Sequence, residues 1–158
     1  MTTLIAPSSV RQIALGNVVH RAAALLPQTA TQNIFTVSGG IIVTSLTGRV
    51  TVVLGATVTT LTVGVTPSGG GSAQNAGLAS ATAITSAAVN TVVSLGATVG
   101  AALVVGAAAG TPQVITTPAG LYVPAGTITI TTSASDTGSM KWDMTYVPFD
   151  DGATVVAA

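Results

Sequence analysis

The stretch GTITITTSASDTGSMKWDMTYVPFDDG, residues 126–152, decides the fold because it holds two alternating segments joined by a turn-rich one. In residues 127–131 (TITIT) the apolar side chains fall on every second position, and in residues 141–146 (KWDMTY) they do so again. Side chains alternate between the two faces of a strand, so each segment is expected to bury one face. The linking residues 133–139 (SASDTGS) supply Asp, Ser and Gly, which favour turns. The stretch therefore predicts a β-hairpin.

The second segment of this stretch also predicts a core anchor and a strand end. Trp142 and Tyr146 fall on one side of it, and a large aromatic side chain contributes mainly buried area, so we expect both to be core or sheet-face anchors. Pro148 cannot donate a hydrogen bond to a neighbouring strand, and Asp150 and Asp151 follow it. The strand is therefore expected to end there or to lie at a sheet edge.

The rest of the chain repeats the pattern of short β-rich segments separated by Gly, Pro and Ser. Two Ala-rich segments, residues 18–26 and 76–90, are also compatible with helix. Strands are expected at residues 10–15, 18–26, 33–37, 41–53, 58–65, 78–85, 91–95, 101–105, 113–116 and 121–123. This number and spacing predict an all-β protein, an antiparallel β-sandwich or a β-barrel of jelly-roll type. We expect an extended N-terminal arm at residues 1–16 and a single β domain at residues 17–158.

The longest β-rich run, residues 41–53, shows how one face is expected to be buried. Its apolar residues of one parity are Ile42, Leu46, Val50 and Val52. Gly48 interrupts the run, which indicates either a β-bulge or a close approach of another group to the backbone.

Charged residues make up 5% of the 158 residues, the formal net charge is zero, and the mean hydropathy is +0.74. Soluble domains typically carry about 25% charged residues. No charged side chain occurs between Arg49 and Asp136, so little self-repulsion keeps copies apart, and we expect association with copies of the same chain. The absence of a basic cluster argues against nucleic acid as a partner.

A membrane or secretory role is not favoured. Residues 92–109 are uncharged and mostly apolar, a length at the threshold for a membrane helix. Three internal glycines and the lack of flanking Lys or Arg argue against such a helix. The first residues lack the basic segment and long apolar core of a signal peptide, which predicts synthesis and folding in a cytoplasm.

The sequence offers no constellation typical of an enzyme. The chain has no cysteine, and His20 is its only histidine, remote in sequence from every acid. A lone His does not assemble a metal site, so we expect it to be structural or exposed. The segment PSGGG at residues 67–71 is followed by no helix signal or nearby Lys, so it predicts a surface turn and not a phosphate loop. Asp150 and Asp151 are adjacent and would point opposite ways on a strand. We therefore expect no enzymatic activity, no catalytic residues, no cofactor and no metal.

Five runs of residues resemble the small virion structural proteins of tailed bacteriophages. Three are PAGTIT at residues 124–129, SASDTG at residues 133–138 and KWDMTYVPFDDGA at residues 141–153. The other two are QNIFTVSGG at residues 32–40 and IVTSLTG at residues 42–48. They cover the two ends of the β region, while the middle is similar in composition only. The motif is structural and not catalytic.

The resemblance implies a cement protein, which decorates and stabilises an icosahedral capsid from its exterior and is made in the host cytoplasm. A phage fibre or tail-associated adhesion protein is the alternative. The implied partners are the major capsid protein and copies of this chain, for which we expect a homotrimer. Arg11 and Arg21 are candidates for contacts with the coat, and Asp150 and Asp151 for contacts with the capsid or another subunit. A secreted glycan-binding module is a rival that would need exposed aromatic side chains.

Overall fold

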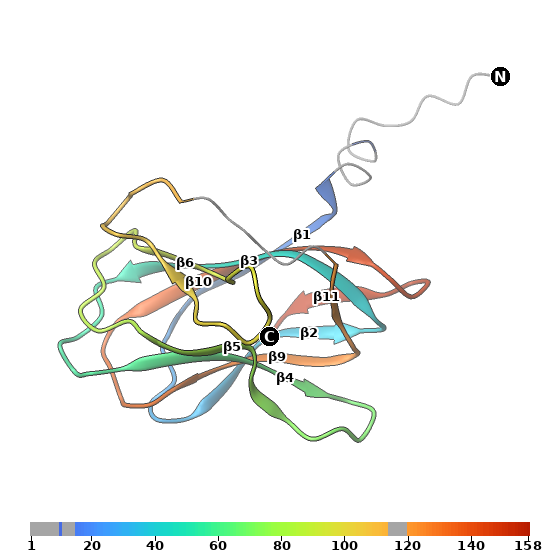
Figure 1. Cartoon of the computed structure of the whole chain (residues 1–158), viewed down its shortest axis with the longest axis horizontal. Coiled ribbons are helices and arrows are strands. Elements are labelled where there is room, and N and C mark those ends of the chain that lie inside the picture. The colour runs from blue at the N-terminus through green and yellow to red at the C-terminus, as the bar shows by residue number, and fades with distance from the viewer. Residues whose placement is uncertain (1–9, 11–14, 114–119) are drawn as a thin grey trace.

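The computed structural model describes residues 10, 15–113 and 120–158, and these form two antiparallel β-sheets stacked as layers (Figure 1). Sheet A has the strand order β1-β10-β3-β6-β7, with β8 also paired to β3, and sheet B has the order β11-β2-β9-β4-β5. The strands are β1 (Asn17–Leu25), β2 (Thr31–Ser38), β3 (Ile41–Val52), β4 (Thr60–Pro67), β5 (Gln74–Ala83), β6 (Val92–Ser94), β7 (Val104–Val105), β8 (Leu121–Val123), β9 (Gly126–Thr132), β10 (Ser139–Pro148) and β11 (Thr154–Ala157). The expectation of an all-β sandwich is confirmed.

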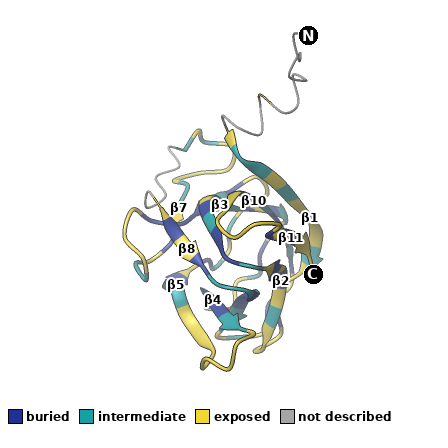
Figure 2. Cartoon of the chain, turned by 90° about the vertical axis from the view of Figure 1, so that its right-hand side faces the viewer, coloured by how far each residue is buried: buried dark blue, intermediate teal, exposed yellow. Residues whose placement is uncertain are grey.

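The core lies between the two sheets and is built from the inward positions of the alternating strands, which are dark blue in Figure 2. Sheet A contributes Trp142, which is 1% exposed, and sheet B faces it with residues such as Ile128. Tyr146 is also buried, and its hydroxyl oxygen accepts a hydrogen bond of 3.2 Å from the backbone N–H of Val155 in sheet B. Both aromatic side chains are therefore core anchors, as predicted.

The predicted hairpin over residues 126–152 is wrong. Strand β9 lies in sheet B between β2 and β4, whereas β10 lies in sheet A between β1 and β3. Residues 133–138 therefore cross from one sheet to the other, and Asp136 within them is buried and accepts a 2.6 Å hydrogen bond from the backbone N–H of Gly55. Alternation identifies the buried face of a strand but not its partner, and turn-forming residues also suit a connection between sheets.

Strand β3 contains a β-bulge that inverts its alternation. The register of β3 against β10 skips Thr44, the extra residue of the bulge. Val43 before it and Leu46 after it are both buried, although they differ in parity. The single buried parity expected for this run is therefore wrong at Ile42, which takes the outward position. A second register shift next to Val52 leaves that side chain exposed.

Gly48 is a site of close approach and not the bulge itself. It pairs with Trp142 of the neighbouring strand β10. A Cβ at this position would lie 2.9 Å from Cη2 and Cζ3 of Trp142, and equally close to Cε of Met140. The missing side chain therefore leaves the room that the indole ring occupies in the core.

Of the two segments that were also compatible with helix, residues 18–25 lie in β1, and residues 76–83 of the segment 76–90 lie in β5. Among the described residues, no helix is long and apolar enough to span a membrane. Residues 92–109 instead form the short strands β6 and β7 with turns between and after them. The expected strands at residues 10–15 and 113–116 lie mostly outside the described residues.

Candidate functional site

The outer face of sheet A changes from apolar at one end of its strands to charged at the other. At one end Tyr122 of β8 pairs with Ile42 of β3, and Ile42 pairs in turn with Val147 of β10. Paired residues of an antiparallel sheet share a face, so these three side chains form one apolar row. Ser45 and Thr145 form the next row along the same two strands, and charged residues follow.

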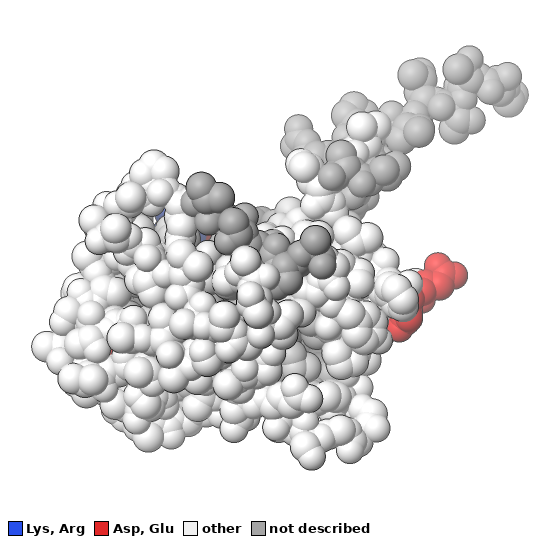
Figure 3. Space-filling view, in the orientation of Figure 1, with Lys and Arg blue, Asp and Glu red and all other residues white. Residues whose placement is uncertain are grey.

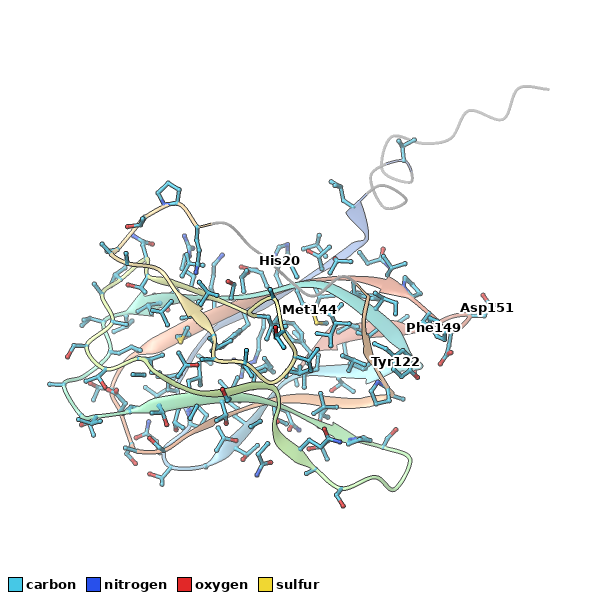
Figure 4. All side chains as sticks on the ribbon, in the orientation of Figure 1. His20, Tyr122, Met144, Phe149 and Asp151 are labelled. Carbon is cyan, nitrogen blue, oxygen red and sulfur yellow. The ribbon has the colours of Figure 1, made fainter. Side chains whose placement is uncertain are left out.

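The apolar row continues into an exposed aromatic pair. The rings of Tyr122 and Phe149 lie edge to face, with centroids 5.3 Å apart and planes at 76° (Figure 4). Tyr122 is 50% exposed and Phe149 is 66% exposed. We call the group of Tyr122, Phe149, Asp150 and Asp151 the aromatic end. Sequence reasoning missed this pair because the two residues belong to segments far apart in the chain and neither alternation nor turn chemistry links them.

Asp150 holds the aromatic end together. Its Oδ2 accepts a 2.5 Å hydrogen bond from the backbone N–H of Gly40, while the backbone N–H groups of Phe149 and Asp150 donate to the carbonyl oxygen of Gly40 at 3.0 and 3.1 Å. A Cβ at Gly40 would lie 2.8 Å from the ring of Tyr122. The glycine therefore lets the chain after β10 dock on the turn between β2 and β3, next to Tyr122.

Asp151 lies beside Asp150 but makes no structural contact. Within residues 10, 15–113 and 120–158 its carboxylate has no hydrogen bond or ion pair. The acidic patch in Figure 3 projects from the right-hand end of the molecule, where Figure 4 labels Asp151. The two adjacent acids thus have different environments, one bonded to a turn and one open to solvent.

This difference predicts different effects of two matched substitutions. Asp150→Ala removes the acceptor of the Gly40 N–H and should lower the free energy of unfolding by about 1–2 kcal/mol. Asp151→Ala removes an exposed carboxylate and should change it by less than about 0.5 kcal/mol. Urea unfolding followed by tryptophan fluorescence measures both. Equal effects of the two substitutions would contradict the assignment of Asp150 as a turn cap.

A charged band crosses sheet A beyond the row of Ser45 and Thr145, and we define it as His20, Arg49, Lys141 and Asp143. His20 Nδ1 lies 2.6 Å from Oδ1 of Asp143, and Lys141 Nζ lies 3.5 Å from Oδ2 of the same carboxylate. The β1–β10 pairing places His20 opposite Asp143, although the sequence suggested that it was remote from every acid. Its side chain is 73% exposed, which agrees with the expectation of an exposed histidine.

Arg49 is the exposed cation of this band. It pairs in register with Lys141 on the adjacent strand, so two like charges stand directly opposite each other, an arrangement that is unfavourable without an anion. Asp143 lies within ion-pair distance of Lys141, but among the described residues no carboxylate lies within that distance of Arg49. The band therefore presents a cation that the described part of the chain leaves unpaired.

The His20–Asp143 pair supplies two of the three groups of a nucleophilic triad, which also needs a hydroxyl or thiol bonded to the second ring nitrogen. In the described part of the chain His20 is hydrogen-bonded to Asp143 alone. The same residues contain no group of three or more side chains able to hold a metal ion.

Arg21, expected as a contact residue, is used inside the molecule. It is 8% exposed, and its Nε donates a 3.0 Å hydrogen bond to the backbone oxygen of Ala158. Burial lowers the pKa of Arg21 from its ordinary value, although an arginine keeps its charge at neutral pH. The side chain ties the edge strand β1 to the residue that follows β11, which leaves little of it for another protein. Arg11 lies outside the described residues.

A small cavity borders Tyr122. Its volume is about 170 Å³, and it is lined mainly by apolar residues such as Val65, Leu78 and Pro124. Pockets for small organic ligands are typically about 300–1,000 Å³. The cavity is therefore a recess in the surface beside the aromatic end that suits a single side chain of another protein better than a cofactor.

No protein-family model, curated protein or solved structure matches this chain. Function is therefore inferred from the surface itself, where the aromatic end and the charged band hold every charged side chain of the described residues except the buried Arg21 and Asp136. Asp150 and Asp151, two of the residues expected to contact a partner, belong to the first of them.

Proposed function

We propose that this protein is a structural virion protein that decorates and stabilises the capsid of a tailed bacteriophage, binding coat protein and copies of itself. The observation that supports this most directly is the exposed Tyr122–Phe149 pair. Aromatic residues are enriched and charged residues depleted in the cores of protein–protein interfaces. A pair of rings with half or more of its surface in water, next to an apolar row, is well suited to be covered by another protein.

The residues that carry the family resemblance also build this surface. The run YVPFDDGA, residues 146–153, contains the end of β10 and the chain that docks on Gly40. The resemblance and the exposed aromatic pair therefore concern the same part of the molecule. This coincidence favours an assembly role in which the motif provides a contact surface.

Binding of this kind stabilises a shell without chemistry. A protein that binds the assembled capsid but not free coat subunits favours the assembled state by mass action. Copies that also contact one another on a lattice bind at high effective concentration, so weak individual contacts suffice. Tight packing of the two sheets and a nearly uncharged surface suit this role.

Co-sedimentation with undecorated capsids of the phage that encodes the chain tests the proposal. The wild-type chain is expected to saturate the capsids at a fixed ratio and to raise their disruption temperature. A Tyr122→Ala/Phe149→Ala double variant should bind at least about tenfold more weakly, because buried aromatic anchors dominate interface energies. Val58→Ala is the control, since Val58 is 79% exposed and lies in the loop after β3, whereas the aromatic end docks on the turn before β3.

Two results would overturn the proposal. One is failure of the folded wild-type chain to co-sediment with capsids at any concentration tested. The other is retention on immobilised polysaccharide that depends on Tyr122 and Phe149, which would favour the glycan-binding module, because exposed aromatic rings are also what such a site needs.

A further inference from the structure

We infer that the aromatic end of one copy docks on the charged band of a neighbouring copy, with Asp151 facing Arg49 across the contact. The inference rests on the self-association that is part of the proposed function. It names the two surfaces through which copies meet.

The two surfaces lie too far apart to satisfy each other within one copy. Arg49 lies seven residues beyond Ile42 along β3, and Ile42 belongs to the apolar row beside Tyr122. At about 3.3 Å per residue, the two ends of the face are separated by roughly 20 Å. In Figure 3 the acidic patch projects from one end only, and little of the basic side chains is visible in that view.

Each surface lacks the charge that the other supplies. Arg49 stands opposite Lys141, and the described residues place no carboxylate within 4.0 Å of it. Asp151 is exposed and, in the same residues, has no cation within that distance. Because no charged side chain occurs between Arg49 and Asp136 in the sequence, few other ionic contacts compete for these groups. Complementary charges of this kind set register and exclude wrong partners.

The aromatic rings of Tyr122 and Phe149 are also suited to bind the guanidinium group of Arg49. A guanidinium group stacks on the face of Tyr or Phe and is more weakly hydrated than an ammonium group. Tyr122 and Phe149 stand beside the acids, so one surface offers both a carboxylate and two rings. Arg49 is therefore the anchor of the charged band, and docking removes the exposed rings from water.

The contact joins two different patches, so it is heterologous. Repeating a heterologous contact produces either a closed ring or an open fibre, depending on the rotation between neighbours. A closed ring of three copies would use both surfaces of every copy and would match the trimer expected from the sequence. The aromatic end of each copy would then cover the band of the next.

Charge reversal in the full chain tests the contact, with native mass spectrometry and sedimentation equilibrium as readouts. Arg49→Asp and Asp151→Arg should each raise the Kd of self-association at least about tenfold, and the double variant should return it to within about threefold of wild type. Thr36→Asp adds a charge on the exposed face of sheet B and should leave the Kd unchanged.

Mixing the two single variants gives a sharper test. The aromatic end of Arg49→Asp is still acidic and the charged band of Asp151→Arg is still basic, while the other surface of each variant has reversed its charge at the substituted residue. Each variant therefore docks only on the other, so the two variants alternate along an assembly. An equimolar mixture should form mixed open oligomers, of which the 1:1 heterodimer is the smallest, and no closed ring of three. Restored wild-type trimers in the mixture would contradict the contact.

The outcomes separate this inference from the proposed function. A wild-type chain that is monomeric at all concentrations, or single variants that associate as wild type does, would overturn the contact. The capsid co-sedimentation of the same variants is measured in parallel. Loss of capsid binding by the wild-type chain would overturn the proposed function and leave the self-association measurement unaffected.

Discussion

Replacing Trp142 with alanine should lower the free energy of unfolding by about 3–5 kcal/mol, the typical cost of removing a buried Trp or Phe side chain. The indole is 1% exposed and rests over Gly48, which has no side chain to fill the space that the indole leaves. The loss of apolar contacts and the remaining cavity both contribute to this cost.

Urea unfolding followed by far-ultraviolet circular dichroism measures this loss, because the substitution removes the only tryptophan. Phe149→Ala is the control, since this aromatic residue is 66% exposed and should change stability by less than about 1 kcal/mol. A Trp142→Ala variant as stable as the control would show that the core does not depend on the indole.

Gly126→Ala should lower the free energy of unfolding by about 3 kcal/mol or more, because backbone strain and overpacking each typically cost about 1–3 kcal/mol. Gly126 has φ of 150°, a conformation that side chains rarely adopt, and it pairs with Pro67 at the end of β4. A Cβ on this residue would clash with the carbonyl oxygen of Thr66 and would lie 2.8 Å from Cα of Pro67. These contacts are with backbone, so two strands must separate to relieve the clash, and both strain and overpacking add to the cost.

Gly69→Ala is the matched control for this substitution. An added Cβ at Gly69 would meet no atom within 4 Å, and the residue does not have a positive φ. Thermal unfolding of both variants beside wild type should show a much lower melting temperature for Gly126→Ala and an almost unchanged one for Gly69→Ala. Similar melting temperatures for the two variants would mean that the β4–β9 contact relaxes without cost.

Much of the sandwich is predictable from the sequence because alternation reports burial directly. Leu61, Val63 and Val65 share a parity in the sequence and are all buried in β4. Trp142 and Tyr146 share a parity in the same way and enter the core from β10. Period-two alternation fails where an extra residue shifts it, as Thr44 does in β3.

Strand pairing was not predictable in the same way. The local signals around residues 133–138 fit a hairpin and a crossing between sheets equally well. The choice between them is made by distant residues, because β10 pairs with β1 and β3 while β9 pairs with β2 and β4. A single sequence contains no direct record of these long-range contacts.

Only part of the candidate site was predictable from the sequence, because its contacts join residues that are distant in the chain. Asp150 and Asp151 were recognised from the sequence, but the hydrogen bond that separates their roles depends on the turn at Gly40. The Tyr122–Phe149 pair and the His20–Asp143 pair each join residues of different strands. Arg21 is buried because β11 ends beside β1, and no local pattern in the sequence indicates that arrangement.

The position of β10 between β1 and β3, and of β9 between β2 and β4, has a consequence for biosynthesis. While the ribosome is still translating residues before 126, the early strands β1 and β3, and likewise β2 and β4, have a gap where their shared neighbour belongs. Neither sheet can complete its strand pairing until the last fifth of the polypeptide, residues 126–158, has left the exit tunnel, and closing such long loops is slow. We therefore expect prematurely terminated chains to remain unfolded and to be degraded, so that only complete polypeptides become available for assembly.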